Sequence, residues 1–507
     1  MQLVPRLEDE KDVDILRQAA KLLDRENQKL SQKVLDLTRE NLSLKGQDPA
    51  TLQTRIAELE QQLAMARERQ FGDSSEKRPR GEKGAEKTPQ TGHGPREQKE
   101  LKPVDELHDL DEADKVCKAC GGALAEIDGQ FEESEEVDVL ERRFVLRKHK
   151  RKKYRCACGG CIETAPPPPK LAPGGRYSID FAIEVAIGKY LDHLPLERQV
   201  RIMRREGLVV DSQTLWDQIE RLARHLRDVY RRIGAHVLGQ AVVGADETRW
   251  RLMGATGKDE GEATRWQVWT ACAADAVFYA IEDSRSADAA EKTFADYEGT
   301  LVCDGYSAYG ALQKRKGKFR LAHCWAHVRR KYVEIEDFFP ERCALILDLI
   351  AELYAAEAAC PRGPDGDALR AKVRSERSRE IVAKIQRWAI EMPALPESGL
   401  GKAIAYMTGI WSGLTVFLED PRVPLDNNAT ERALRGVVIG RKNHYGSRSR
   451  RGTEVAALLY SIVETAKLAG VEPKAYLRAA VLAALREEEP PLPHEITRMP
   501  PTEVEHA

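Results

Sequence analysis

Three acidic residues occupy local contexts that suit metal-dependent chemistry. Asp246 and Asp304 each follow a short apolar run, and Glu431 lies in the polar segment Asp-Asn-Asn-Ala-Thr-Glu-Arg-Ala-Leu-Arg that begins at Asp426. We expect the aspartates at the ends of two neighbouring strands and Glu431 on a later helix, so that the three carboxylates converge. Carboxylate oxygens are preferred ligands of Mg²⁺, and two such ions about 4 Å apart can activate the attacking oxygen and stabilise the leaving oxygen at a phosphodiester. These residues therefore predict a site for two Mg²⁺ ions and phosphoryl-transfer chemistry.

Each acidic residue also has an ordinary structural interpretation. Asp246 could cap a strand end, and Asp304 could belong to a glycine-containing turn. Glu431 could complete a capping box with Asn428 as the helix N-cap. Asp426 is a rival for the third ligand position, but Glu431 is preferred because it lies one helix turn into the segment and can face inward. The occurrence of all three acidic contexts in one chain favours the metal site.

The segments around the two aspartates alternate between short strands and helices. We expect strands at 241–245, 266–272, 276–281, 300–303 and 319–323, and a helix at 287–297. The first and fourth of these strands then end at Asp246 and Asp304, which is the order of a ribonuclease-H-like α/β domain. Residues 340–418 have a helical pattern with two breaks rich in proline and glycine, and we expect them to form a helical insertion ahead of Glu431.

The N-terminal segment carries a heptad repeat. Leucine recurs every seven residues, at Leu16, Leu23, Leu30, Leu37 and Leu44. The positions three residues ahead of the leucines include Asn27 and Asn41, and asparagine at such a position favours a parallel, in-register dimer. A single amphipathic helix packed on the rest of the protein is the alternative. We expect a parallel coiled coil over 1–69, followed by a flexible linker over 70–102, where apolar residues are scarce.

Five of the ten cysteines cluster in two groups. They are Cys117, Cys120, Cys156, Cys158 and Cys161. Four thiolates from two such groups hold one structural Zn²⁺ in a zinc ribbon, so one of the last three cysteines is surplus. We expect a zinc-binding module over 103–165, with a strand at 144–150 between the two groups. A set of free thiols is the alternative.

Residues 176–235 have a wholly helical pattern. One helix is expected from about 196 to 207, and a second, capped by Asp211 or Ser212, from 214 to 233. Two helices joined by a short turn are compatible with a DNA-binding helix-turn-helix and equally with a plain helical hairpin. In the first case four arginines would contact DNA phosphates, namely Arg198, Arg201, Arg204 and Arg205.

Other basic residues lie close to the acidic positions. Cys324 and His327 have the spacing of a metal-ligand pair, but no fourth partner is evident, so structural roles are expected for both. The basic residues predicted to hold DNA phosphates in this region are Arg329, Arg330, Arg432, Arg435, Arg441 and Lys442. A solvated basic helix face is the alternative for the last four.

The composition directs attention to local charge. The 507 residues carry a formal net charge of −2, and 42% of them are hydrophobic. Acidic residues concentrate over 105–138, whereas basic residues concentrate over 142–155, 198–205 and 432–451, and such local fields attract phosphate. No apolar run approaches the roughly 20 residues of a membrane helix, and the N-terminus lacks the apolar core of a signal peptide. We therefore expect a cytoplasmic protein.

Taken together, these motifs resemble the bacterial IS-sixty-six group of transposases. The resemblance rests on Asp-Glu-Thr at 246–248, Cys-Asp-Gly-Tyr-Ser-Ala-Tyr at 303–309, His-Cys-Trp-Ala-His-Val-Arg-Arg-Lys at 323–331, the polar segment from Asp426, Gly-Arg-Lys-Asn at 440–443 and Phe-Gly-Asp-Ser-Ser-Glu-Lys at 71–77. It covers nearly the whole chain, in the family's order of leucine zipper, zinc-binding region, catalytic domain and short C-terminal domain. The surplus cysteine and the long acidic stretch depart from the family pattern.

The resemblance implies a DDE transposase whose metal-binding triad is Asp246, Asp304 and Glu431. Such an enzyme cleaves DNA at the ends of an insertion sequence and joins the freed 3′-hydroxyl to target DNA. Its expected partners are the terminal inverted repeats, the target DNA, a second copy of the chain in a homodimer or higher oligomer, and accessory proteins encoded by the same element, all at the bacterial nucleoid. A non-catalytic DNA-binding protein (a repressor or a domesticated transposase) and a metal-dependent nuclease without strand transfer are the alternatives.

The expected organisation is multidomain α+β. Its parts are a coiled coil at 1–69, a linker at 70–102, a zinc-binding module at 103–165, a helical hairpin at 176–235, a ribonuclease-H-like catalytic domain at 236–445 with its insertion at about 340–418, and a C-terminal helical domain and tail at 446–507.

A first prediction concerns the coiled coil. Replacing both Asn27 and Asn41 with valine should raise the helix stability of residues 1–70 and loosen the choice of oligomer, because the buried asparagine pairs specify the dimer at a cost in stability. Sedimentation of this peptide tests the expectation. A wild-type peptide that stays monomeric at tens of micromolar contradicts it.

Overall fold

The computed structural model describes residues 144–155, 162–253, 266–361 and 363–496. All of them belong to one of two compact units. The coiled coil, the linker, the acidic stretch and all five clustered cysteines lie outside the described residues, so their predicted structures stay predictions. The described part of the zinc-binding module is an antiparallel pair of short strands, β1 (Lys153–Arg155) and β2 (Ile162–Thr164). The strand expected at 144–150 is wrong, because those residues have no regular structure.

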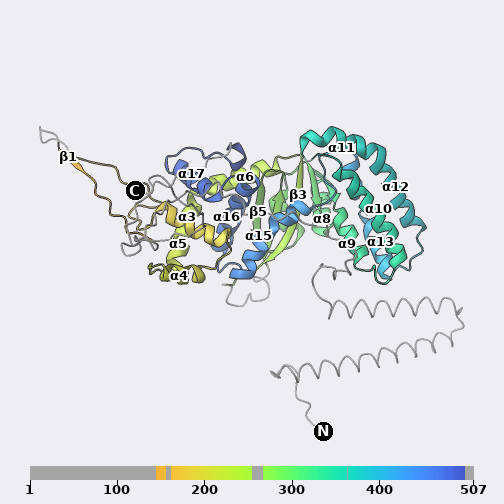
Figure 1. Cartoon of the computed structure of the whole chain (residues 1–507), viewed down its shortest axis with the longest axis horizontal. Coiled ribbons are helices and arrows are strands. Elements are labelled where there is room, and N and C mark those ends of the chain that lie inside the picture. The colour runs from red at the N-terminus through yellow and green to blue at the C-terminus, as the bar shows by residue number, and fades with distance from the viewer. Residues whose placement is uncertain (1–143, 156–161, 254–265, 362, 497–507) are drawn as a thin grey trace, which may run out of the picture. The chain divides into compact units, whose positions relative to one another are not determined.

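One mixed five-stranded sheet forms the centre of the fold (Figure 1). Its strands are β3 (Val242–Trp250), β4 (Trp266–Cys272), β5 (Val277–Glu282), β6 (Thr300–Cys303) and β7 (Arg320–His323), in the spatial order β5-β4-β3-β6-β7. The pairs β3–β4 and β4–β5 are antiparallel, whereas β3–β6 and β6–β7 are parallel. All five expected strands are therefore present.

The first strand of the sheet is longer than expected. Asp246 lies inside β3 and not at its end, because antiparallel pairing with β4 continues to Trp250. Trp250 is 1% exposed, so burial of this large side chain stabilises the continuation of the strand. On the other side of β3, the parallel pairing with β6 stops at Gly244, which lies opposite Val302.

A helical block precedes the sheet. It comprises α3 (Ile179–Tyr190), α4 (Leu196–Arg205), α5 (Ser212–His225) and α6 (Arg227–Leu238). The expected cap is present, because the Asp211 side chain accepts a hydrogen bond of 2.6 Å from the Thr214 amide. The single helix expected over 214–233 is wrong, since the chain turns at Leu226. Leu226 is fully buried, which suggests that packing, and not a local breaker residue, produces the turn.

A C-terminal helix covers the outer edge of β5, which is the last strand on that side of the sheet. In α16 (Arg450–Leu468), the hydroxyls of Ser461 and Thr465 accept hydrogen bonds from the backbone amides of Tyr279 and Val277, at 2.9 and 3.1 Å. Serine and threonine four residues apart lie on one helix face, so both reach the same strand edge. The edge strand is thereby prevented from pairing with another chain. A further helix, α17 (Pro473–Leu485), packs against α16 and α3.

The insertion between the second aspartate and Glu431 is helical, as expected. After α9 (Trp325–Val333) it contains α10 (Pro340–Ala358), α11 (Asp367–Val373), α12 (Arg379–Glu391), α13 (Gly399–Gly409) and α14 (Trp411–Leu414). A buried arginine holds these helices together. Arg374 is 1% exposed, and its guanidinium pairs with both carboxylate oxygens of Glu357 at 2.6 and 2.8 Å and donates to the carbonyl of Phe417 at 2.6 Å.

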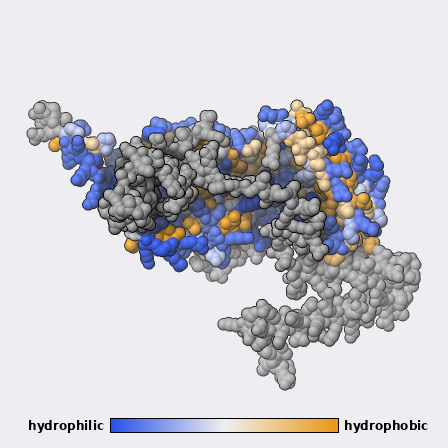
Figure 2. All heavy atoms as spheres, in the orientation of Figure 1, coloured by the Kyte–Doolittle hydropathy of each residue, from blue (hydrophilic) through white to orange (hydrophobic). Residues whose placement is uncertain are grey.

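Helices cover both faces of the sheet. Helices α7 (Ala287–Phe294) and α8 (Ser307–Lys316) follow β5 and β6, and α15 (Asn428–His444) packs against β3 and β4. Figure 2 shows hydrophilic residues over most of the described surface in that view. None of the described helices is long and apolar enough to cross a membrane.

A glycine permits the close approach of α15 to the sheet. A Cβ atom on Gly244 would lie 2.0 Å from Thr430 Oγ1 and 2.6 Å from Asn427 Oδ1. The side-chain amide of Asn427 donates a hydrogen bond of 2.8 Å to the carbonyl of Ala245, and Thr430 donates one of 2.6 Å to Asn427. The start of α15 is therefore fixed directly on the backbone of β3.

This contact gives a stability prediction. Gly244→Ala should destabilise the protein by about 1–3 kcal/mol, because the new methyl group overlaps the Thr430 hydroxyl in a packed interface. Adding Thr430→Ala should recover part of the loss. Denaturant unfolding measures both effects.

The matched control for this variant is Gly310→Ala. Gly310 lies within α8 and has no atom within 4 Å of the added methyl group. That change should stabilise the protein by about 0.5–1 kcal/mol, because alanine is the better helix former. Equal effects of the two alanine substitutions would contradict the close contact at Gly244.

Candidate active site

The register of the sheet brings the two aspartates to the same level. Gly244 on β3 lies opposite Val302 on β6, and Asp246 and Asp304 each follow two residues later. Neighbouring parallel strands advance by about 3.3 Å per residue, so equal offsets from a paired position keep residues side by side. Gly244 and Asp246 also share one face of β3, because side chains alternate along a strand. This is the face on which α15 lies.

The backbone around Asp304 forms a turn directly after β6. The Asp304 side chain accepts a hydrogen bond of 2.9 Å from the Tyr306 amide, and Gly305 has a positive φ of 88°. The hydroxyl of Tyr406, on α13, donates a hydrogen bond of 2.6 Å to the Asp304 carbonyl. The helical insertion thus contacts the backbone that carries the second aspartate.

Glu431 lies in the first turn of α15 and does not cap it. The N-cap is Asn427, whose carbonyl accepts from the Glu431 amide at 3.1 Å. Glu431 Oε1 is buried and has no hydrogen-bond partner among the described residues. The His327 imidazole on α9 lies nearby, with 3.7 Å between its Nε2 atom and Glu431 Oε1. The capping-box interpretation with Asn428 as N-cap is therefore wrong.

Asp426, the alternative candidate for the third ligand, forms hydrogen bonds at the start of α15. Its two carboxylate oxygens accept hydrogen bonds from the backbone and side-chain nitrogens of Asn428, at 3.1 and 2.7 Å. A carboxylate beside the first amides of a helix stabilises that helix end. Of the two acidic candidates, Glu431 has the oxygen without a hydrogen bond.

The electrostatics of the site suit a cation. The pKa of Asp246 is raised to about 7, and burial is the largest of the causes. The negative charge of Glu247 raises this pKa further, and Asp304 and Glu431 add to the effect. Several carboxylates therefore repel one another here, and a divalent cation would relieve that repulsion.

The spacing of the three carboxylates is wider than a single-ion cage. Their ligand atoms do not all lie within 4.8 Å of one another. Among the described residues, only His236, Asp275 and His494 form a group that is so compact. In a two-metal site the ions are about 4 Å apart, so ligands of different ions need not be neighbours. The donor set of carboxylate oxygens, with one buried oxygen left without a hydrogen bond, fits two hard divalent cations.

Glu247 is a fourth carboxylate that sequence reasoning passed over. It points to the face of β3 opposite to Asp246, and its side chain is only 2% exposed. Arg285 pairs with it, with 3.0 Å between Nε and Oε1, and the Tyr309 hydroxyl on α8 donates to Oε2 at 3.0 Å. Burial raises the pKa of Glu247, while the hydrogen bond from Arg285 acts in the opposite direction.

Arg285 connects this buried carboxylate to the turn after Asp304. Its guanidinium lies 4.0 Å from the centre of the Tyr306 ring, and the Tyr306 hydroxyl donates to the Arg285 carbonyl at 2.7 Å. The sequence contains one signal for this pairing, which is the acidic Glu247 directly after Asp246. A charged residue on the inner face of a strand needs a partner of opposite charge.

The predicted DNA-binding residues differ in their surroundings. Those on α4 are all exposed, as are Arg329, Arg330, Arg432, Arg435 and Lys442. Arg441 is different, because its guanidinium donates to the Thr248 hydroxyl at 3.2 Å and to the carbonyl of Arg249. Arg441 therefore connects α15 to β3.

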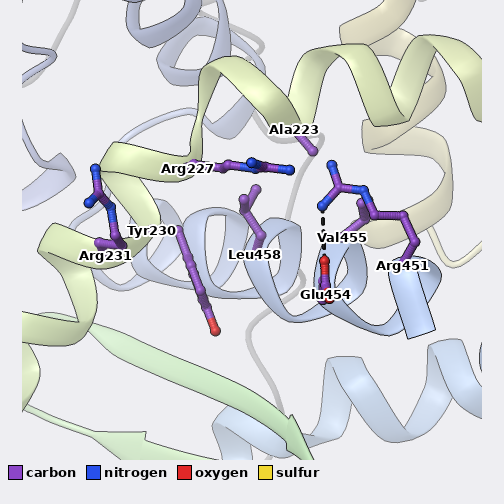
Figure 3. Close-up of a pocket in the computed structure, with 8 residues that line it drawn as sticks. All are labelled: Ala223, Arg227, Tyr230, Arg231, Arg451, Glu454, Val455 and Leu458. Atoms are coloured by element: carbon purple, nitrogen blue, oxygen red, sulfur yellow. Dashed lines mark hydrogen bonds and ion pairs between the residues drawn. The ribbon is translucent and has the colours of Figure 1, made fainter.

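A basic pocket lies between α5, α6 and α16. Figure 3 shows three arginines at this pocket, Arg227, Arg231 and Arg451, around the apolar side chain of Leu458. Arg451 forms ion pairs with Glu220 and Glu454 at 3.2 and 3.0 Å. The pocket is lined by none of the candidate metal ligands.

Two family models match the chain. The family model described as Transposase IS66 family matches residues 174–455, which is more than half of the 507-residue chain. The model described as zinc-finger binding domain of transposase IS66 matches residues 114–159, inside the zinc-binding module expected from the sequence.

Three relatives from Sinorhizobium fredii (strain NBRC 101917 / NGR234) are similar over most of their length. The chain is 33% identical to uncharacterized protein y4jD, over 72% of this chain and 73% of the relative. It is 28% identical to uncharacterized protein y4hP, over 76% and 72% of the two chains, and 29% identical to uncharacterized protein y4qI, over 84% and 78%. By the extent of the family match, the chain belongs to the transposase IS66 family.

Proposed function

We propose that this transposase is a DDE enzyme in which Asp246, Asp304 and Glu431 bind two Mg²⁺ ions. The observation that carries the proposal is the joint placement of the three residues. Equal offsets in the β3–β6 register align the aspartates, and the close contact at Gly244 holds α15 against the same face of β3. The buried Glu431 oxygen without a hydrogen bond supports a ligand role for this residue.

The proposed fold of the catalytic domain is ribonuclease-H-like. The order β5-β4-β3-β6-β7, with three antiparallel strands followed by two parallel ones, supports it. The helical insertion between Asp304 and Glu431 belongs to this domain and contacts its second aspartate through Tyr406.

The proposed reaction has two steps. Water hydrolyses one strand at an end of the element, and the freed 3′-hydroxyl then attacks a phosphodiester of the target DNA. When bound, the two Mg²⁺ ions would activate each attacking oxygen and stabilise the leaving oxygen. The three carboxylates hold the ions, and the exposed arginines of α4 and α15 hold DNA phosphates and fix the register of the duplex.

Other parts of the chain complete the proposal. Dimerisation through residues 1–69 would bring two catalytic domains to the paired ends of the element. One structural Zn²⁺ would be held by four of the five clustered cysteines, and accessory proteins of the same element would join the complex on DNA in the nucleoid.

The central prediction concerns the three ligands. Asp246→Asn, Asp304→Asn and Glu431→Gln should each lower strand cleavage by more than about 100-fold, because each removes a charged ligand at nearly constant volume. Folding and DNA binding should be retained. Incubation with labelled element ends, target plasmid and Mg²⁺ measures cleavage and joining together.

Asp426→Asn is the matched control, because Asp426 already bonds to the helix start. It should cost about 1 kcal/mol or less in stability and leave most of the cleavage activity. Loss of cleavage in this variant, with activity kept in Glu431→Gln, would reassign the third ligand. Cleaved but unjoined ends would indicate a nuclease, and intact ends would indicate a DNA-binding protein without activity.

A further prediction concerns the pairing of the buried Glu247 with Arg285. Arg285→Ala should cost about 1–3 kcal/mol, because it leaves the buried carboxylate without its counter-charge. Glu247→Gln should cost less, since the amide keeps the shape and can still accept from Tyr309. The double variant should therefore be more stable than Arg285→Ala alone, and denaturant unfolding of the three proteins tests this. Strictly additive losses would show that the pair is not coupled.

A further inference from the structure

A second group of metal-ligating side chains lies away from the carboxylate site. His236, Asp275 and His494 each offer one ligand atom, and these atoms all lie within 4.8 Å of one another. His236 Nε2 is 3.1 Å from both oxygens of Asp275. Among the described residues, no other group of three or more histidine, cysteine or acidic side chains is so compact.

Three separate elements supply the three side chains. His236 is in the last turn of α6, and Asp275 is in the tight turn between β4 and β5, which is closed by a hydrogen bond of 2.8 Å from the Ala273 amide to the Ala276 carbonyl. His494 is in the short 3₁₀ turn Pro493–Glu495, near the end of the described chain. The group thus joins segments that are far apart in the sequence.

The C-terminal segment is already held against α6 by Arg232. Its guanidinium pairs with Glu489 at 2.9 Å and approaches Glu495 at 3.8 Å. Arg232 and His236 are four residues apart and therefore share one helix face. The Tyr476 hydroxyl donates to the carbonyl of Pro491 at 2.9 Å. These contacts fix the backbone that carries His494 beside His236.

The contact between His236 and Asp275 explains only part of this geometry. His236 and Asp275 are hydrogen-bond partners of each other. His494 adds a second imidazole, whose ring is stacked on that of His236 with 3.9 Å between centroids. His494 Nδ1 is buried and has no hydrogen-bond partner in the described part of the chain. A buried ring nitrogen without a partner calls for a bound ion or water, and the neighbouring histidine and carboxylate offer further metal ligands.

We propose that His236, Asp275 and His494 bind one Zn²⁺ ion that attaches the C-terminal segment to α6 and to the β4–β5 turn. Two imidazoles and one carboxylate are a common set for zinc, with water as the fourth ligand. Donors bound to one tetrahedral zinc lie about 3.3 Å apart, close to the 3.1 Å between His236 and Asp275. Since the ion must lie near the plane of each imidazole, binding would widen the 21° angle between the rings.

This site is independent of the catalytic proposal and of the cysteine module. It has no thiolate, so Co²⁺ bound here would give d–d absorption without the sulfur-to-metal charge-transfer band that a cysteine site gives. Cobalt substitution of the full chain can therefore distinguish the two kinds of site.

The test is the zinc content of the full-length protein after zinc loading and desalting. His494→Gln and Asp275→Asn should each hold about one equivalent less than the wild type. In the cobalt-loaded protein both variants should lose d–d intensity while keeping the charge-transfer band. Zinc should raise the melting temperature of the wild type more than that of either variant.

His225→Gln is the matched control, because His225 bonds only to the carbonyl of Leu171, at 2.9 Å, and has no carboxylate partner in the described structure. It should keep the wild-type zinc content. Asp275 is 42% exposed on a turn, so Asp275→Asn should fold even if His494→Gln does not. Equal zinc content in the wild type and in folded Asp275→Asn would overturn the proposal, and so would equal d–d intensity in the cobalt proteins.

Discussion

The proposed three-carboxylate site depends on the close contact between α15 and β3 at Gly244. The β3–β6 register and the turn after β6 bring Asp246 and Asp304 to the same end of the paired strands. Glu431, in contrast, comes from a helix that follows a long insertion. The direct contact of α15 with the backbone of β3 brings Glu431 near Asp246 and Asp304. Asn427 fixes the helix start by bonding to the Ala245 carbonyl, and the missing side chain of Gly244 leaves the space.

The same arrangement concentrates negative charge, and the surrounding structure compensates for only part of it. On one face of β3, Arg285 neutralises Glu247 and connects it to the turn after Asp304. On the other face, burial and the neighbouring carboxylates raise the pKa of Asp246, and a buried Glu431 oxygen has no hydrogen-bond partner among the described residues. In the proposed two-metal site, bound divalent ions would relieve the repulsion between the carboxylates and would thereby stabilise the folded domain.

Much of the fold followed from local sequence patterns, because short apolar strands and capped helices carry strong local signals. The strands at 266–272 and 300–303 are examples. Features that depend on tertiary packing could not be predicted. Burial of Trp250 extends β3 past Asp246, and burial of Leu226 divides a helix that has no internal breaker.

The site shows the same division between local and tertiary signals. The motifs singled out Asp246 and its two partners, but the pairing of Glu247 with Arg285 depends on residues that only the folded sheet brings together. The binding of Arg441 to the β3 backbone and the meeting of His236 with His494 have the same origin. Spacing along the chain carries no signal for such contacts.

The proposed chemistry requires two metal ions between the three carboxylates. Anomalous diffraction from crystals of the protein with a pre-cleaved element end, soaked in Mn²⁺, tests this directly, because Mn²⁺ replaces Mg²⁺ at oxygen sites. We expect two peaks about 4 Å apart, in contact with Asp246, Asp304 and Glu431. A single peak, or peaks bound by Asp426 in place of Glu431, would contradict the proposed two-metal site.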